Sequence, residues 1–251
     1  MTTYNGGRFL KEQLDSILSQ LSFNDEVIIS DDGSTDNTLD IIQSYEDKRI
    51  KLLNHVKKKK QKYTFSYTTA NIKNALKHAK GDSIFLADQD DVWLPNKVEV
   101  MLKYCQDYDL VLADCIEVDK NLQIICESHF KLYNAKIGIW HNLKGPCCYL
   151  GSNMCFKRDL LYKFMDIPDV VPHDLWIGVI TNLTGKMLLL HEKTMLYRRH
   201  EWNVSGINNK VLRGLSIQTL GTIQRNNHSL FFKIKYRLDF LFQLLKRELF
   251  H

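Results

Sequence analysis

The run Asp88-Gln89-Asp90-Asp91 is the part of the sequence best suited to chemistry, because it follows directly on the apolar segment 83–87. Carboxylates this close repel one another, so the cluster is costly unless a positive charge lies among them. Hard oxygen ligands at a strand end suit Mg²⁺ or Mn²⁺, ions that are commonly shared with the phosphates of a substrate. The alternative interpretation is a polar turn whose aspartates cap backbone groups.

A second acidic turn, residues 31–36, follows the β-branched run 26–30 and begins with Asp31 and Asp32. On its own, this pattern is typical of a turn that leads into a helix cap. Ligands of open parallel sheets bind beyond the carboxyl ends of the strands. Because the two acidic turns end two strands of the same predicted sheet, we expect them to lie at one rim.

Alternating helix and strand patterns must position these turns. Helical spacing of apolar residues predicts helices over 9–21, 38–45, 70–79 and 95–105, and apolar runs predict strands over 26–30, 50–53, 83–87 and 109–113. This alternation indicates an α/β fold with a mostly parallel sheet and helices on both faces. Beyond residue 114 we expect a loop over 145–153, a short helix over 174–184, one or two strands over 187–197 and a long helix over 229–250.

The charge is divided unevenly between the two parts of the chain. The 251 residues carry a net charge of +5, yet residues 207–251 alone hold eight basic and two acidic side chains. The tail is therefore the part suited to an anionic surface, and as a basic amphipathic helix it suits a membrane interface with anionic lipid. The alternative is a helix that packs on its own domain or on a partner. No nucleic-acid-binding module is visible, so we expect no nucleic acid among the partners.

The composition also restricts the compartment and the use of cysteine. With 44% hydrophobic residues the chain can bury a large core, but no stretch approaches the roughly 18 uncharged apolar residues of a membrane span. Charged residues follow the start too closely for a secretory signal, so we expect a cytoplasmic protein, with peripheral contact to the inner face of the plasma membrane through the tail. The six cysteines lack a CxxC spacing and are expected to be buried thiols rather than zinc ligands.

Five short segments together resemble the family 2 glycosyltransferases in their order along the chain. They are Thr3-Tyr4-Asn5-Gly6, residues 31–36, residues 87–93, His173-Asp174-Leu175-Trp176 and Tyr197-Arg198-Arg199-His200. The Asp-Gln-Asp-Asp-x-Trp form is most similar to the bacterial branch that contains rhamnosyltransferases and other surface-polysaccharide enzymes. The resemblance covers roughly residues 1–206 and implies a GT-A fold, a nucleotide-sugar donor, Mg²⁺ or Mn²⁺, and inversion at the anomeric carbon.

The resemblance also implies roles for individual residues. Nucleoside binding is implied for Thr3, Tyr4, Asn5, Asp31 and Asp88, with a carboxylate accepting the N3–H of uracil or thymine. Metal binding is implied for Asp90, Asp91 and His200, although which aspartate of the cluster binds the ion stays open.

Asp174 is implied as the general base that takes the proton of the acceptor hydroxyl. Arg198 and Arg199 are candidates for the diphosphate, and Trp93 and Trp176 for stacking on a sugar. The alternatives are a helix N-cap for Asp174, surface positions for the arginines and core positions for the tryptophans.

We therefore divide the chain into a GT-A domain over residues 1–206 and a basic amphipathic helical tail over 207–251. Members of the family carry a hydrophobic strand just before the segment that corresponds to Thr3–Gly6, and only Met1 and Thr2 precede it here. We expect most of that strand to be missing, and a form extended by five to seven apolar residues to be more stable.

The function expected is transfer of a sugar from a dTDP-rhamnose or UDP-hexose type of donor to a saccharide or polyprenyl-diphosphate-linked acceptor, in the synthesis of bacterial capsule, O-antigen or cell-wall polysaccharide. The alternatives are a nucleotide-sugar-binding relative with impaired catalysis, and a membrane-associated assembly factor that acts through its tail.

Overall fold

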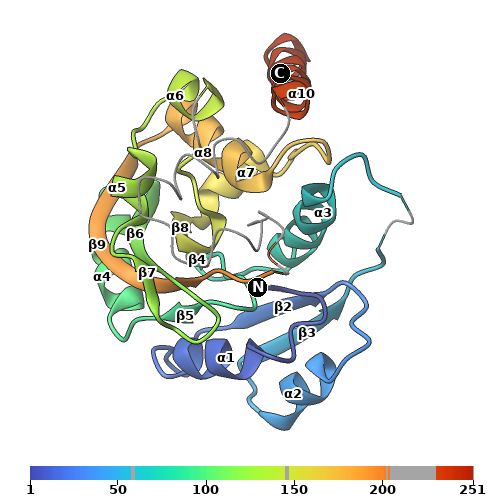
Figure 1. Cartoon of the computed structure of the whole chain (residues 1–251), viewed down its shortest axis with the longest axis vertical. Helices are drawn as coiled ribbons and strands as arrows, with labels where there is room; N and C mark the ends of the chain where they lie inside the picture. Colours follow the sequence, from blue (N-terminus) through green and yellow to red (C-terminus); the bar gives the residue numbers. More distant parts are fainter. Residues whose placement is uncertain (58–59, 145–146, 202, 204–229, 251) are drawn as a thin grey trace.

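The structure is a computed structural model that describes residues 1–57, 60–144, 147–201, 203 and 230–250. Figure 1 shows helices α1 (Leu10–Leu18) and α2 (Thr38–Ser44) at one end of the molecule. Helices α6 (Ile139–Lys144), α7 (Leu161–Phe164), α8 (His173–Thr184) and α10 (Leu230–Phe250) lie at the other end. The strands lie between the two groups, which confirms the predicted mixed α/β architecture.

The first sheet is parallel and has the order β1 (Thr2–Thr3), β2 (Val27–Asp31), β3 (Ile50–Asn54). All five residues of β2 are buried, in keeping with the continuous apolar run expected of a central parallel strand. Register pairs Thr3 with Asp31, and Asp31 with Asn54, so the ends of the three strands lie together. Helix α3 (Phe65–Leu76) packs on β1 and β2, and begins five residues before the predicted start.

The second sheet has the order β4 (Ser83–Phe85), β8 (Met154–Lys157), β6 (Leu110–Val118), β9 (Met187–Arg198), β5 (Val92–Trp93), with β7 (Ile124–Cys126) beside β6. Only its β6–β9 pair is parallel, and the other four pairings are antiparallel. The expectation of a mostly parallel sheet therefore holds for the first sheet, whereas the second is mixed. Strand β8, which lies between β4 and β6 and runs against both, was not predicted.

Helices close the core on the remaining sides. Helix α4 (Lys97–Cys105) packs on β6 and β8, α5 (His129–Tyr133) packs on β6, and the 3-10 turns η1 (Gly151–Asn153) and η2 (Arg158–Leu160) flank β8. All six cysteines are free thiols and five are buried, as expected from the sequence. Within the described part of the chain, no helix combines the length and apolar character that crossing a bilayer requires.

The tail helix α10 packs on the domain. Phe240 is buried against Trp176 of α8, with ring centroids 5.7 Å apart. Asp239 accepts hydrogen bonds from Lys62 and Tyr63, and Arg247 pairs with Asp166 at 3.1 Å. One side of the helix therefore packs on its own domain, which was the alternative to contact with a membrane. The predicted boundary between residues 206 and 207 lies outside the described residues.

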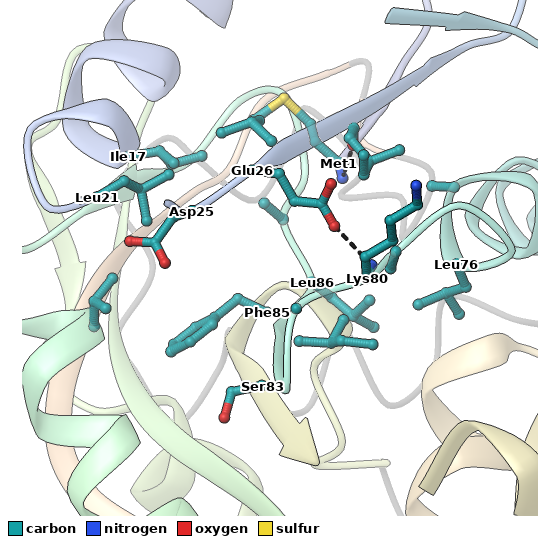
Figure 2. A pocket seen from close by; sticks show the side chains of 18 of the residues that line it. Met1, Ile17, Leu21, Asp25, Glu26, Leu76, Lys80, Ser83, Phe85 and Leu86 are labelled. Atoms are coloured by element: carbon teal, nitrogen blue, oxygen red, sulfur yellow. Dashed lines mark hydrogen bonds between the residues drawn. The ribbon is translucent and has the colours of Figure 1, made fainter. Parts of the chain in front are cut away.

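Strand β1 is short, and a cavity of about 590 Å³ lies beside it. Figure 2 shows this cavity between the start of β2 and the start of β4, with Met1 at its edge. The Met1 ammonium donates to the Ile28 carbonyl at 2.8 Å, and the Thr2 N–H approaches the Ala87 carbonyl at 3.4 Å. The strand expected to be mostly absent is therefore formed over two residues.

Candidate functional site

Three loops meet at one rim of the first sheet, as the two acidic turns predicted. The turn after β1 contacts the loop after β4, where the Tyr4 N–H donates to Gln89 Oε1 at 2.8 Å and Gln89 Nε2 donates to the Tyr4 carbonyl at 3.1 Å. The same turn contacts the loop after β2, because the Thr35 N–H donates to Asn5 Oδ1 at 2.8 Å. The two acidic segments are thus connected through the Thr3–Gly6 segment.

Two backbone features allow this close approach of the loops. A Cβ atom on Gly6 would lie 2.2 Å from Gln89 Oε1, so any side chain there would separate the turn from the acidic loop. Asn5 has a φ of 50°, in the left-handed region that asparagine adopts more readily than most residues. Asn5 therefore shapes the turn and holds Thr35, while its side chain remains exposed at the rim.

Asp31 organises the turn after β2. Its Oδ2 accepts the N–H groups of Gly33 and Ser34, and its Oδ1 accepts the hydroxyls of Thr3 and Ser34. The carboxylate is buried and fully used by the protein. This corrects the prediction that Asp31 receives the N–H of a base and that the Thr3 hydroxyl contacts a ligand.

Asp32, next along the turn, is better placed to face a ligand. Its Oδ1 lies 2.6 Å from His55 Nδ1, and its Oδ2 lies 3.9 Å from Lys57 Nζ. The same lysine Nζ lies 3.5 Å from the centroid of the Tyr4 ring, which is 46% exposed. The tyrosine face, a carboxylate and an imidazole therefore surround one spot at the ends of β1, β2 and β3. His55 and Lys57 were missed from the sequence, although they directly follow a strand predicted to end at this rim.

The loop after β4 carries the acidic cluster. Burial, and then the charges of Asp90 and Asp174, raise the pKa of the Asp88 carboxyl above its ordinary value. Asp90 Oδ2 lies 2.8 Å from His200 Nε2 and accepts a hydrogen bond from Asn203 at 3.1 Å. The end of β9 is thereby brought to the cluster, as predicted for His200.

Asp91 lies deeper than its neighbours in the cluster. Its side chain is fully buried, and its Oδ1 accepts the N–H of Arg198 at 3.0 Å. Burial and the charges of Asp90 and Asp88 raise the pKa of Asp91 well above the ordinary value. Asp91 thus connects the acidic loop to β9, a structural position that suits a metal ligand less well than those of Asp88 and Asp90.

The donor atoms of the cluster fit a divalent cation that shares its coordination with phosphate. Among the described residues, no three His, Cys, Asp or Glu side chains gather closely enough to hold a metal by themselves. Mg²⁺, however, is usually bound by one or two carboxylates together with substrate phosphates and water. Asp88 and Asp90 offer two such carboxylates, and because the charge of Asp90 raises the pKa of the Asp88 carboxyl, a cation between them would be stabilising.

Asp174 lies at the start of α8, half-buried beside the same cluster. Burial raises the pKa of its carboxyl, and its charge is the third cause of the raised pKa of Asp88. Its Oδ1 also accepts the Leu175 N–H at 2.7 Å, whereas the N-cap of α8 is Pro172, so Asp174 is not the N-cap residue. Cys147 is a further neighbour, since burial and the charge of Asp174 raise the pKa of its thiol. Nothing in the sequence pattern had indicated Cys147.

The two arginines before His200 are engaged within the protein. Arg198 is buried, donates to the carbonyls of Asp90 and Lys120, and pairs with Glu12. Arg199 is also buried, donates to the Tyr197 hydroxyl at 2.9 Å, and lies 3.9 Å from Glu117. These contacts correct the prediction that both guanidinium groups face a diphosphate.

The two tryptophans are core residues. Trp176 is fully buried, and Trp93 is 5% exposed with its ring 5.6 Å from that of Phe85. A sugar cannot stack on rings that the protein encloses, so the prediction that they contact a sugar is wrong and the core alternative is correct.

Comparison with known proteins gives a consistent result. The sequence model of the family described as Glycosyl transferase family 2 matches residues 1–164. The chain is 28% identical to the dTDP-rhamnosyl transferase RfbG of Shigella flexneri, covering 83% of this chain and 74% of that protein. It is 32% identical to the glycosyltransferase GlyG of Streptococcus pneumoniae over 80% and 70% of the two chains. It spans 64% of the length of the uncharacterized glycosyltransferase alr2836 of Nostoc, to which it is 26% identical over 81% of its own residues.

Two solved structures share the fold. TarS 1–349 of S. aureus in complex with UDP-GlcNAc aligns with a TM-score of 0.63 at 21% identity, over 96% of this chain and 70% of that one. The mannosyltransferase PcManGT of Pyrobaculum calidifontis, in complex with GDP-Man and Mn²⁺, aligns with a TM-score of 0.60 at 17% identity, over 95% and 71%. At these identities the likeness concerns the fold alone, and it confirms the predicted GT-A architecture.

Proposed function

We propose, from the premise that this chain belongs to glycosyl transferase family 2, that its site transfers a sugar from a nucleotide-diphospho-sugar to an acceptor hydroxyl with inversion. The observation that carries the proposal is the meeting of Asp88, Asp90 and Asp174 at one rim. The first two come from the end of β4 and the third from the start of α8. A cation site and a base would thus come from two different elements of one acidic site.

The nucleoside belongs at the ends of β1, β2 and β3. A base stacked near Tyr4 would place a pyrimidine N3–H within reach of Asp32, a carboxylate held by His55 and Lys57. RfbG, by its name, uses a dTDP-linked rhamnose, and TarS was solved with UDP-GlcNAc. We therefore propose a donor of the dTDP-rhamnose or UDP-hexose type.

The diphosphate belongs beside Asp88 and Asp90. These carboxylates, with His200 on Asp90, would hold Mg²⁺ or Mn²⁺, which neutralises the charge that develops on the leaving diphosphate. PcManGT was solved with Mn²⁺ and its donor. The protein's own contribution is to fix Asp90 through His200 and Asn203 and to keep Asp88 partly out of water.

Asp174 is proposed as the general base. A carboxylate with a raised pKa accepts a proton more readily, so it can take the proton of the acceptor hydroxyl as that oxygen attacks the anomeric carbon. Asp174 lies at the first turn of α8, and the positive end of the helix dipole favours its ionised form until the proton arrives.

The acceptor is proposed to be a saccharide or a polyprenyl-diphosphate-linked sugar, and the process the synthesis of a bacterial surface polysaccharide at the inner face of the plasma membrane. The name of RfbG supports the rhamnosyl branch of such enzymes. A second candidate function is donor binding without transfer, which is favoured by the shortness of β1, a two-residue strand beside a cavity of about 590 Å³.

One set of reactions separates the two functions. The protein is incubated with a panel of dTDP- and UDP-sugars and Mn²⁺, and the products are identified by mass spectrometry. Release of nucleoside diphosphate with transfer or hydrolysis supports the enzyme, whereas binding without any turnover supports the second candidate.

Calorimetry on three variants tests the cation site. We expect Asp88→Asn and Asp90→Asn to lose the part of donor affinity that depends on Mn²⁺. Asp91→Ala should lower the melting temperature, because it removes the acceptor for the Arg198 N–H of β9. Asp40→Asn, on the exposed side of α2, is the matched control. Unchanged Mn²⁺ dependence in both Asp88→Asn and Asp90→Asn would contradict the assignment.

A further inference from the structure

Helix α10 has two apolar sides, and the domain covers only one of them. The covered side carries Phe240, which is fully buried, with Leu241 and Leu244 packed on the same core. The opposite side carries Leu238, Phe242 and Leu245, which are 61%, 65% and 63% exposed. Steps of four and three residues place these three side chains in one stripe along the helix. We call them the outer stripe.

Exposed aromatic residues occur on the neighbouring helices as well. Trp140 of α6 is 63% exposed and Tyr162 of α7 is 88% exposed. Helices α6 and α7 both pack on α8, which also receives Phe240 of α10. All of these helices lie at the end of the molecule away from α1 and α2 (Figure 1). Tryptophan and tyrosine are the residues that favour the boundary between hydrocarbon and water in membranes.

The charge around the outer stripe favours an anionic partner. Two carboxylates at α10 are matched, Asp239 by Lys62 and Asp166 by Arg247. Lys246 is exposed next to the stripe, and Lys163 is exposed next to Tyr162. Residues 230–250, which form α10, carry five basic and two acidic side chains in their sequence. An apolar stripe with this excess of positive charge is complementary to a layer of anionic lipid.

We propose that the outer stripe of α10 docks this protein on the surface of an anionic phospholipid bilayer, with the helix lying in the plane of the interface. The inner side of the same helix holds the domain through Phe240 and the Asp239 and Arg247 pairs, so a docked helix carries the domain with it. The inference does not depend on the proposed transferase activity.

Vesicle co-sedimentation of the full chain tests the proposal. The probes are phosphatidylcholine vesicles with about 30% phosphatidylglycerol and vesicles of phosphatidylcholine alone, each at about 0.1 M and about 0.5 M salt. We expect binding to the anionic vesicles at low salt, and weaker binding at high salt or to neutral vesicles. The triple variant Leu238→Gln, Phe242→Gln, Leu245→Gln should lower partitioning by roughly tenfold or more.

The control is the double variant Phe23→Gln, Val56→Gln, which removes two side chains that are at least as exposed, from loops beside α1 and after β3. It should bind vesicles like the unmodified chain. Circular dichroism and donor calorimetry should give unchanged results for both variants. This would show that the fold and the nucleotide site are intact, and it would separate the vesicle result from any result on sugar transfer.

Three outcomes would overturn the proposal. They are absence of binding to anionic vesicles by the unmodified chain, equal binding by the outer-stripe variant, and equal loss in the control. If light scattering shows a dimer that only the outer-stripe variant abolishes, and vesicles are not bound, the stripe is covered by a second copy of the chain instead.

Discussion

Asp31 and Asp32 are adjacent and both buried, yet their carboxylates have different surroundings. Asp31 accepts four hydrogen bonds within its own turn and from Thr3. Asp32 interacts with a histidine and a lysine, two side chains that a ligand can rearrange. A carboxylate whose acceptor sites are all used stabilises the fold, whereas one held by two other side chains can exchange them for a substrate.

The two aspartates should therefore respond differently to the same substitution. Asp31→Asn places an amide N–H₂ against backbone donors, and we expect it to lower the free energy of unfolding by about 1–3 kcal/mol. Asp32→Asn should leave the melting temperature nearly unchanged and weaken donor binding. Thermal melting and calorimetry on both variants measure the melting temperature and the donor affinity. The reverse pattern would indicate that Asp31, and not Asp32, contacts the nucleoside.

For Asp174→Asn we expect donor binding to be nearly intact and kcat to fall by about 10²-fold or more, the range for losing a general base. Asp40→Asn, on an exposed turn of α2, should retain full activity.

The unmodified enzyme should lose activity as the pH falls through the pKa of Asp174, because the base must be deprotonated. Since burial raises that pKa, the acidic limb should lie above the range of an ordinary aspartate. A pH–rate profile without such a limb, or normal turnover by the variant, would show that the proton goes elsewhere.

Residue type alone predicted the acidic cluster and its partner His200, but not burial. The arginines and tryptophans were assigned to ligands because such side chains bind phosphates and sugars, and the fold encloses all four. Lys97 is another polar residue whose burial the sequence pattern does not reveal. Its ammonium is fully buried and donates to Asn153 Oδ1 at 2.6 Å and to the Ser152 carbonyl. Which polar side chains are enclosed depends on neighbours from distant parts of the chain, and these are absent from a local pattern.

At the scale of elements, repeating patterns predicted the long helices and the buried strands. Helices α1, α2, α4, α8 and α10 and strands β2, β3, β4 and β9 lie close to their expected positions. The parallel or antiparallel direction of the strands in the second sheet was not predictable from such patterns. A strand buried on both faces has an apolar sequence whichever way it pairs, and β8 directly follows a segment interpreted as a loop.

The cavity beside β1 leads to a prediction about the sheet. Its walls combine apolar side chains with charged ones such as Glu26 and Lys80, and burial lowers the pKa of the Met1 amine at its edge to about 6. We expect a chain extended before Met1 by five alternating valines and isoleucines to melt at a higher temperature. The added residues would pair beside β2 and replace the buried amine with a peptide group.

An extension of the same length made of serine and asparagine is the control, because it lacks the apolar side chains that fill the cavity. Equal melting temperatures for the two extended forms and the unextended chain would mean that this space does not accept a strand.

At the scale of the whole molecule, the question is whether α10 is held firmly on the domain, and substitution of Phe240 tests this. Phe240→Ala removes the side chain that packs on Trp176, whereas Leu238→Ala removes one that is 61% exposed. We expect the backbone amides of α10 to exchange with deuterium faster in the first variant and at an unchanged rate in the second. Equal exchange in both would indicate that the contact with α8 does not hold the helix.

The buried amine of Met1 has a consequence for how opening of the molecule can be timed. In a chain expressed to begin at Met1, burial lowers the pKa of this amine to about 6, so protonation shields it from acylating reagents less than it shields lysines. The protein shields it instead, through β2 and the loop after β4. The rate at which an activated ester labels this nitrogen therefore reports how often the protein opens around β1. A donor that holds the β1, β2 and β4 turns together should slow that labelling in proportion to its occupancy.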